Sequence, residues 1–387
     1  MKRTLYFGCL SGILLMAACE RLDNEHTLPD QPEETVFTLE EVARLLSAVP
    51  VGEAQVGEVH DAVSASAGNG YDEEYTMRNL FETPGCGIGS VSATRAEPYP
   101  VPLRDLLAAE IHRQYGTRAL DADALVEALS DSDIQIYWPF SEEFGSDETP
   151  VITFDPGDNS TRNTGFLRRE DGIVEECLVD EEMARSRPVW VISRNLDAEY
   201  KSLEIRRRED PDWGQGGGSI LVRTRATGDK PFQTLVLRSF QANRQYDSWF
   251  SGGSEFFVKC GAVEDFNATT EAELRLYSPS ITDFLIVVRR NQVGKALDFN
   301  AVLVSEWTRM LDNCAFMCTE DDGGTQTTWK CSAVVKYNSK SYGFDVELPL
   351  HARDDIVWRG ALTRSYIEKY SGTTGHFGDV DLVLELI

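Results

Sequence analysis

The apolar residues in the N-terminal part of the chain recur at the spacing of an α-helix. Thr38–Glu41 has the pattern of a capping box, in which a hydroxyl and a carboxylate satisfy free backbone donors at a helix start. The apolar residues that follow fall on one helix face: Leu39, Val42, Leu45, Leu46 and Val49. Pro50 then ends this helix. Similar patterns predict helices near residues 56–63, 72–81, 103–111 and 122–129, with Asp72 as the cap of the second of these.

From Ile134 onward the pattern changes to a period of two residues, which indicates β-strands. In the middle of the chain we expect strands over residues 134–138, 151–154, 166–168, 174–179, 189–193 and 203–207, and a short acidic helix over residues 180–184. In the last part we expect strands over residues 220–224, 234–240, 255–260, 273–277, 284–289, 299–304, 314–319, 329–337, 342–348, 356–362 and 381–386. Many short strands separated by turn signals favour an antiparallel sandwich.

The two patterns together predict an α+β protein. A helical region over residues 35–130 would be followed by a β-rich α+β region over residues 131–218. A C-terminal antiparallel β-sandwich would occupy residues 219–387. The chain of 387 residues is long enough for two or three such regions.

Residues 1–18 have the pattern of a secretory signal peptide. Lys2 and Arg3 provide its charged start, and an apolar segment extends from Leu5 to Met16. This segment is too short to cross a membrane as a helix, which needs roughly 20 residues. Two alanines then lead to Cys19, so export and cleavage before Cys19 are expected.

The segment Leu15–Cys19 resembles the lipobox of bacterial lipoproteins, although Met16 stands where leucine is usual. The thiol of Cys19 is then the lipidation site, and several acyl chains would attach the chain stably to a membrane. Residues 19–34 form an acidic, proline-containing tether, which resembles the export tags of surface lipoproteins in the Bacteroidota. We therefore expect an outer-membrane location with exposure at the cell surface. An ordinary signal peptide cleaved after Ala18 is the alternative.

The charge of the chain excludes some classes of partner. The formal net charge is -27, and loss of Lys2 and Arg3 with the signal peptide would bring it to -29. Such a charge repels nucleic acid and anionic lipid headgroups, so no nucleic-acid partner is expected. The basic segment Arg206–Arg208 does not reverse this, and it is interpreted as a solvated strand face.

Searches for catalytic motifs find none in the sequence. It contains no Gly-x-Ser-x-Gly, no His-Glu-x-x-His and no phosphate-binding glycine loop. We therefore favour a non-enzymatic binding or assembly protein over an enzyme, with an envelope protein or a glycan as partner. The alternative is a secreted hydrolase whose site is assembled from residues distant in sequence.

Acidic turns between the C-terminal strands are candidate calcium ligands. Glu320, Asp321 and Asp322 connect two predicted strands, and Asp354 with Asp355 precedes another. Loops at one end of a sandwich can converge, and calcium accepts six to eight oxygen ligands in flexible geometry. These turns resemble, over a short length only, the calcium loops of C2-type sandwiches. Solvated hairpin turns in an acidic protein are the alternative interpretation.

The cysteines predict no zinc site but suggest one disulfide. No Cys-x-x-Cys pair occurs, and no histidine lies at zinc-ligand spacing from a cysteine. A two-residue turn at Asp322–Gly323 would place Cys314 opposite Cys331 and make this pair a disulfide candidate. A register shift of four residues would pair Cys318 with Cys331 instead.

Several phrases together resemble an uncharacterised family of Bacteroidota lipoproteins. They are Gly70–Tyr75, Pro150–Phe154, Pro188–Ile192, Asp247–Phe250, Glu255–Val258 and Phe377–Val380. The resemblance extends over most of the mature chain. It implies a lipoprotein of the cell surface and assigns no activity to any residue.

Overall fold

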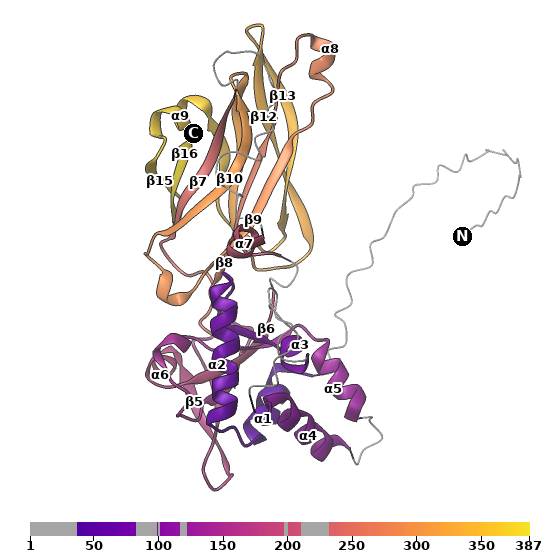
Figure 1. Ribbon diagram of the computed structural model, residues 1–387, viewed down its shortest axis with the longest axis vertical. Helices are drawn as coiled ribbons and strands as arrows, with labels where there is room; N and C mark the ends of the chain where they lie inside the picture. Colours follow the sequence, from indigo (N-terminus) through magenta and orange to yellow (C-terminus); the bar gives the residue numbers. More distant parts are fainter. Residues whose placement is uncertain (1–36, 83–98, 100, 117–121, 197–199, 210–231) are drawn as a thin grey trace, which may run out of the picture. The chain divides into compact units, whose positions relative to one another are not determined.

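The computed structural model describes residues 37–82, 99, 101–116, 122–196, 200–209 and 232–387. The predicted signal peptide, Cys19, the tether and the predicted strand over residues 220–224 lie outside these ranges. Helices are concentrated in the N-terminal part and strands in the C-terminal part, so the α+β class is confirmed (Figure 1). Within the described ranges, no helix combines the length and apolar character needed to cross a membrane.

The N-terminal helices begin close to where the sequence signals predict, except the third, which begins at Met77 and not after Asp72. They are α1 (Leu39–Ala48), α2 (Glu53–Gly68), α3 (Met77–Phe81), α4 (Leu103–Tyr115) and α5 (Ala122–Ser130). The capping box of α1 is confirmed, because Oγ1 of Thr38 accepts from the Glu41 amide at 3.2 Å and Glu41 Oε2 accepts from the Thr38 amide at 2.8 Å. The apolar face of α1 is buried.

The predicted cap of the third helix is wrong. Residues 74–76 form a short strand, β1 (Glu74–Thr76), and Thr76 caps α3 by accepting from the Asn79 amide at 3.2 Å. Asp72 instead accepts a hydrogen bond from the distant Gly253 amide at 2.8 Å. A buried carboxylate needs a donor, and in Asp72 this donor comes from a loop that the local sequence does not reveal.

A mixed six-stranded sheet packs against these helices in the order β1-β2-β6-β3-β4-β5. Its other strands are β2 (Ile134–Tyr137), β3 (Val151–Phe154), β4 (Arg162–Arg168), β5 (Val174–Asp180) and β6 (Val189–Arg194). The β3–β6 pair is parallel, and α6 (Glu181–Ser186) lies between β5 and β6 in the chain. Val42, Leu107, Ile136 and Trp190 belong to one buried cluster, so the boundary expected at residue 130 falls within a shared core.

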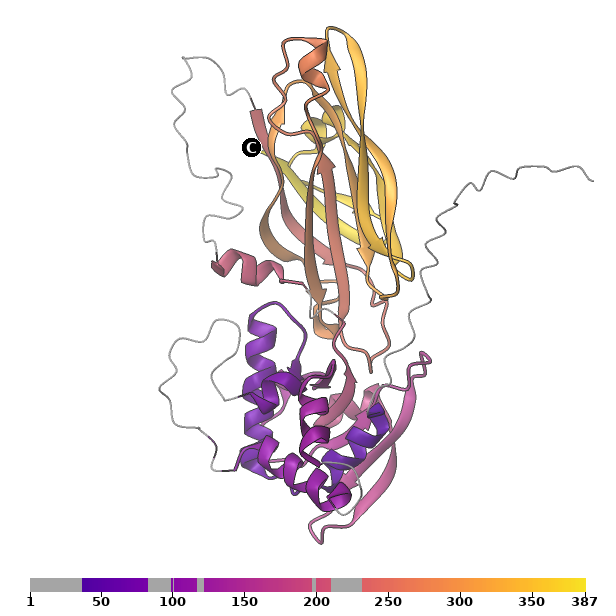
Figure 2. The same cartoon turned by 90° about the vertical axis from the view of Figure 1, so that its right-hand side faces the viewer.

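Two antiparallel sheets make up the C-terminal part. One has the order β10-β7-β16-β15, and the other has the order β13-β12-β11-β8-β9 with β14 also paired to β11. The strands are β7 (Phe232–Ala242), β8 (Ser254–Ala262), β9 (Ser280–Val288), β10 (Leu297–Thr308), β11 (Leu311–Glu320), β12 (Gln326–Tyr337), β13 (Lys340–His351), β14 (Asp355–Thr363), β15 (Thr373–Phe377) and β16 (Val380–Leu386). Phe240, Leu382, Phe256 and Phe316 join one core between the sheets, as a sandwich requires (Figures 1 and 2).

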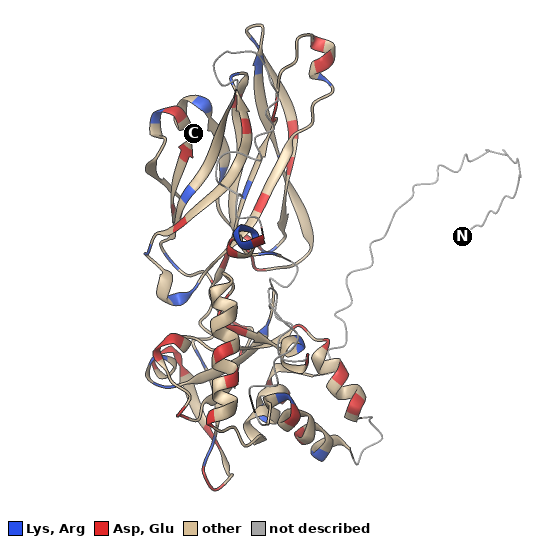
Figure 3. Cartoon of the chain, viewed as in Figure 1, with Lys and Arg blue, Asp and Glu red and all other residues tan. Residues whose placement is uncertain are grey.

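Two predicted strands are helices in the structure. Residues 203–207 lie in α7 (Leu203–Glu209), which also carries the three arginines (Figure 3), and residues 271–274 form α8 (Glu271–Leu274). The α8 helix has a side-chain cap, since Oγ1 of Thr270 accepts from the Glu273 amide at 3.2 Å. In segments this short, one or two apolar residues fit either periodicity, so the cap decides the structure. The helix α9 (Arg364–Tyr370) and the strand β15 were not predicted.

Candidate metal centres at one end of the β-sandwich

The five predicted calcium ligands all lie at one end of a single sheet. Glu320 ends β11 and Asp355 begins β14, and the two are register partners. Asp321 and Asp322 follow β11, and Asp354 directly precedes β14. The structure therefore brings together turns that are about thirty residues apart in the sequence, as predicted, but it divides their side chains into two groups.

The division follows from the alternation of side chains along extended backbone. Glu320, Asp322 and Asp355 form one group, and Asp321 with Asp354 forms another that includes His351. Neighbours in sequence therefore belong to different groups. A single calcium site with all five predicted residues is not formed.

Two further carboxylates extend the first group. Asp247, from the loop between β7 and β8, and Glu255, on β8, have oxygens within 4.8 Å of one another and of Glu320. We call these residues together with Asp322 and Asp355 the Glu320 cluster. Two oxygens bound to one calcium ion at about 2.4 Å can be at most about 4.8 Å apart. The spacing within each of the two groups of three, which share Glu320, is therefore compatible with ligation of one calcium ion by that group.

Glu320 is the buried member of this cluster. It is 0% exposed, and neither of its carboxylate oxygens has a hydrogen-bond donor as partner. Burial and the nearby Asp247 carboxylate raise the pKa of Glu320 far above its ordinary value. Burial likewise raises the pKa of Asp247 to about 6, and Oδ2 of Asp247 also has no hydrogen-bond partner. Unpaired buried carboxylates are costly unless they retain a proton or bind a cation.

Arginine side chains lower the pKa values of two other members of the Glu320 cluster, Asp322 and Asp247. Burial raises the pKa of Asp322, and Arg353 opposes this; at Asp247 burial is opposed in part by Arg290. At Glu320, burial and the carboxylates of Asp247, Asp322 and Asp355 all raise the pKa. The carboxylates around Glu320 therefore oppose its ionisation.

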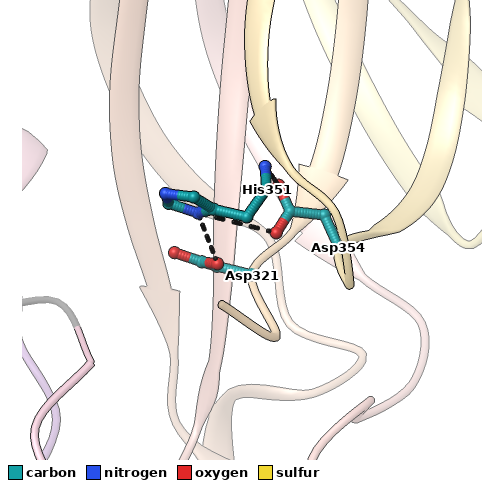
Figure 4. A group of neighbouring side chains, drawn as sticks. All are labelled: Asp321, His351 and Asp354. Carbon is teal, nitrogen blue, oxygen red and sulfur yellow. Dashed lines mark hydrogen bonds and ion pairs between the residues drawn. The ribbon is translucent and has the colours of Figure 1, made fainter. Parts of the chain in front are cut away.

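The second group, shown in Figure 4, combines an imidazole with two carboxylates. His351 ends β13, and its Nδ1 lies 3.0 Å from Oδ1 of Asp321 and 3.7 Å from Oδ1 of Asp354. The Asp354 side chain is 1% exposed, and its Oδ1 has no hydrogen-bond partner. We call these three residues the His351 group.

Sequence reasoning missed three of the residues that the structure brings together. Asp247, Glu255 and His351 lie outside the acidic turns that were singled out. Glu255 is a single carboxylate within an apolar strand, and such a residue commonly faces solvent. His351 ends β13, so a search for polar residues at strand ends would have found it, whereas Asp247 lies within the loop between β7 and β8.

The predicted opposition of Cys314 and Cys331 is wrong. Residues 321–325 connect β11 to β12 in place of a two-residue turn, and the two strands pair only near Leu311 and Asn313. Beyond that point β14 takes the place of β12, so Cys314 lies opposite Leu362. The described cysteines, including Cys314 and Cys331, are free thiols. The local hairpin argument could not foresee that another strand would separate the pair.

The thiol of Cys260, on β8, interacts with that of Cys314. A hydrogen bond with Cys314, followed by burial, raises the pKa of Cys260 well above its ordinary value. Both residues lie within the sandwich core. Neutral, buried thiols such as these behave as small apolar side chains.

Comparison of the chain with protein-family models, with curated proteins and with solved structures finds no match. The resemblance to Bacteroidota lipoproteins therefore stays a prediction. Function has to be argued from the chemistry of the two groups at the end of the sandwich.

Proposed function

We propose that this chain is a lipid-anchored cell-envelope protein that binds calcium through the Glu320 cluster. The supporting observation is the fully buried Glu320 carboxylate, which has no hydrogen-bond donor and is surrounded by other carboxylates. A cation at this position would offset both the lost hydration of Glu320 and the repulsion from its neighbours.

The ligand set favours calcium over other common cations. The Glu320 cluster offers only carboxylate oxygens, which hard cations prefer. Calcium accepts six to eight oxygens in flexible geometry, whereas magnesium requires nearly ideal octahedral geometry and retains its water ligands. The carboxylates form two groups of three that share Glu320, and the flexible geometry of calcium suits such ligands from separate parts of the chain better than that of magnesium.

The exposure of the cluster suggests a role in binding. Glu320 is buried at its inner end, whereas Asp322 and Asp355 are exposed. A calcium ion held between them would remain accessible to an oxygen of an envelope protein or a glycan. The ion would also link the loops at Asp247, Asp322 and Asp355 into one rigid surface. A calcium-dependent binding or assembly protein is therefore the function that the geometry supports best.

Thermal unfolding with and without calcium tests the calcium proposal. We expect calcium to raise the unfolding midpoint of the chelator-treated chain, because saturation at about 100 times the dissociation constant adds about 2.7 kcal/mol to stability. Magnesium at equal ionic strength should raise it less. The Glu347→Gln variant should respond to calcium as the wild type does, because Glu347 is an exposed carboxylate on the same sheet, 3.2 Å from Lys330. Equal midpoints with calcium and with chelator would contradict the proposal.

Membrane attachment is tested separately at Cys19. In a bacterial host that processes lipoproteins, we expect the mature chain to begin at Cys19 and to carry acyl groups there, as intact-mass spectrometry would show. Cys19→Ser should release the chain from the membrane fraction, because the anchor depends on the thiol. An unmodified mature N-terminus at Cys19 would favour the ordinary signal peptide instead.

A further inference from the structure

The His351 group has a ligand chemistry different from that of the Glu320 cluster. It offers one imidazole nitrogen and two carboxylate oxygens, and it shares no residue with the Glu320 cluster. Imidazole nitrogen is a preferred ligand of zinc and related transition metals, whereas calcium is bound almost entirely by oxygen. Three protein ligands with an open fourth position are typical of zinc sites that retain a water molecule.

The distances in the His351 group agree with ligation of a small cation. Ligands about 2.05 Å from a tetrahedral zinc ion lie roughly 3.3 Å from one another. Nδ1 of His351 is 3.0 Å from Oδ1 of Asp321 and 3.7 Å from Oδ1 of Asp354. These two separations therefore lie within about 0.4 Å of the tetrahedral value, and a carboxylate oxygen of Asp321 lies within 4.8 Å of one of Asp354.

The hydrogen bonds of the two carboxylates hold them in place and leave one oxygen free. Oδ2 of Asp354 accepts from the His351 amide at 2.8 Å, while the buried Oδ1 accepts no hydrogen bond and faces Nδ1 of His351 at 3.7 Å (Figure 4). Asp321 is fixed by the Gly323 amide, which donates to Oδ1 at 2.7 Å. Among the described residues, neither aspartate forms an ion pair with a lysine or an arginine. A metal ion held between Asp354 Oδ1 and the imidazole would therefore contact an oxygen that accepts no hydrogen bond.

From these observations we propose that Asp321, His351 and Asp354 bind a divalent transition metal of the zinc class, independently of the calcium site. The side chain of His351 is 22% exposed, so the ion would contact solvent and could exchange its water for another ligand. The ion would connect the loop after β11 to the end of β13 and to the start of β14. The search for cysteine-based zinc patterns could not find this site, because it contains no cysteine.

Metal titration of the chelator-treated full-length chain tests the proposal. We expect the wild-type chain to bind one zinc ion. The His351→Gln and Asp354→Asn variants should bind zinc at least about 100-fold more weakly, because losing even an outer partner of a metal ligand lowers metal affinity 10–100-fold. His376→Gln is the matched control, because Nδ1 of His376 lies 2.6 Å from Asp381 Oδ1 but is 71% exposed. This control variant should bind zinc as the wild type does. Unchanged zinc binding in His351→Gln would overturn the proposal.

Cobalt substitution gives a readout that needs no variant. Cobalt in the His351 group should show the absorption of a four- or five-coordinate ion with nitrogen and oxygen ligands. Sulfur charge-transfer bands would instead place the ion on free cysteines and overturn the proposal. Excess calcium should leave the cobalt spectrum unchanged, and Glu320→Gln should leave zinc affinity unchanged, because the sites share no residue. Loss of zinc binding in Glu320→Gln would assign the ion to the Glu320 cluster.

Discussion

Glu320→Gln is expected to stabilise the calcium-free chain and to abolish its stabilisation by calcium. The substitution replaces a carboxyl group whose pKa burial raises, in a side chain that is 0% exposed and has no hydrogen-bond donor, with an amide that needs no proton to be neutral. It also supplies an amide that can donate to the adjacent Asp247 carboxylate. We expect the free energy of unfolding to rise by about 1–3 kcal/mol, within the range of about 1–4 kcal/mol found when buried ion pairs are replaced by well-packed apolar residues. Thermal and denaturant unfolding in chelator would measure this rise.

The pH dependence of stability gives the same prediction a second readout. Burial raises the pKa values of both Glu320 and Asp247 in the folded chain; Asp247 raises that of Glu320 further, whereas Glu320 lowers that of Asp247 in part. Above the unfolded values of about 4, the folded chain therefore holds more protons than the unfolded chain, and its stability falls as pH rises. We expect a smaller fall between about pH 4 and pH 7 in Glu320→Gln than in the calcium-free wild type.

Two outcomes would contradict this account of Glu320. One is a Glu320→Gln chain that is less stable than the wild type in chelator, which would mean that the carboxylate has a stabilising partner. The other is a variant that still gains stability on adding calcium. The Glu347→Gln control should change neither property, since Glu347 is exposed and paired with Lys330.

Much of the fold could be predicted because its signals are local. The capping box at Thr38 and the apolar face of α1 fix the first helix, and the change of period at Ile134 marks the first long strand segment. Errors arose where a segment was too short for its period to be decisive, as in α7 and α8. The wrong cap at Asp72 has a different cause, because its partner is the amide of Gly253.

The candidate site could be predicted only in part for the same reason. The acidic turns identified the correct end of the sheet, because strand ends are visible in the sequence. Their division into two groups depends on the side of the backbone from which each side chain leaves, and this requires the exact ends of β11 and β14. Asp247 and His351 joined the groups through strand pairing, which the local pattern does not specify.

Trp307→Ala is expected to cause a large loss of stability while leaving the response to calcium intact. Trp307 is 1% exposed in the sandwich core, and its indole Nε1 donates to the Leu311 carbonyl at 3.0 Å. Truncating a buried tryptophan costs about 3–5 kcal/mol through lost burial and the cavity left behind. Trp329→Ala is the matched control, because Trp329 is only partly buried beneath a guanidinium group 5.7 Å away. Denaturant unfolding should show a much smaller loss for this control.

The distance between Trp307 and the Glu320 cluster makes a further comparison decisive. Trp307 contacts Leu311 at the start of β11, whereas Glu320 ends that strand, roughly 30 Å away at about 3.3 Å per residue. Changes that far apart should add within about 0.5 kcal/mol. The change in the free energy of unfolding of the double variant Trp307→Ala/Glu320→Gln should therefore equal the loss caused by Trp307→Ala plus the gain caused by Glu320→Gln. A non-additive result would mean that the metal site is coupled to the core along β11, and its calcium response would then be a property of the whole sandwich.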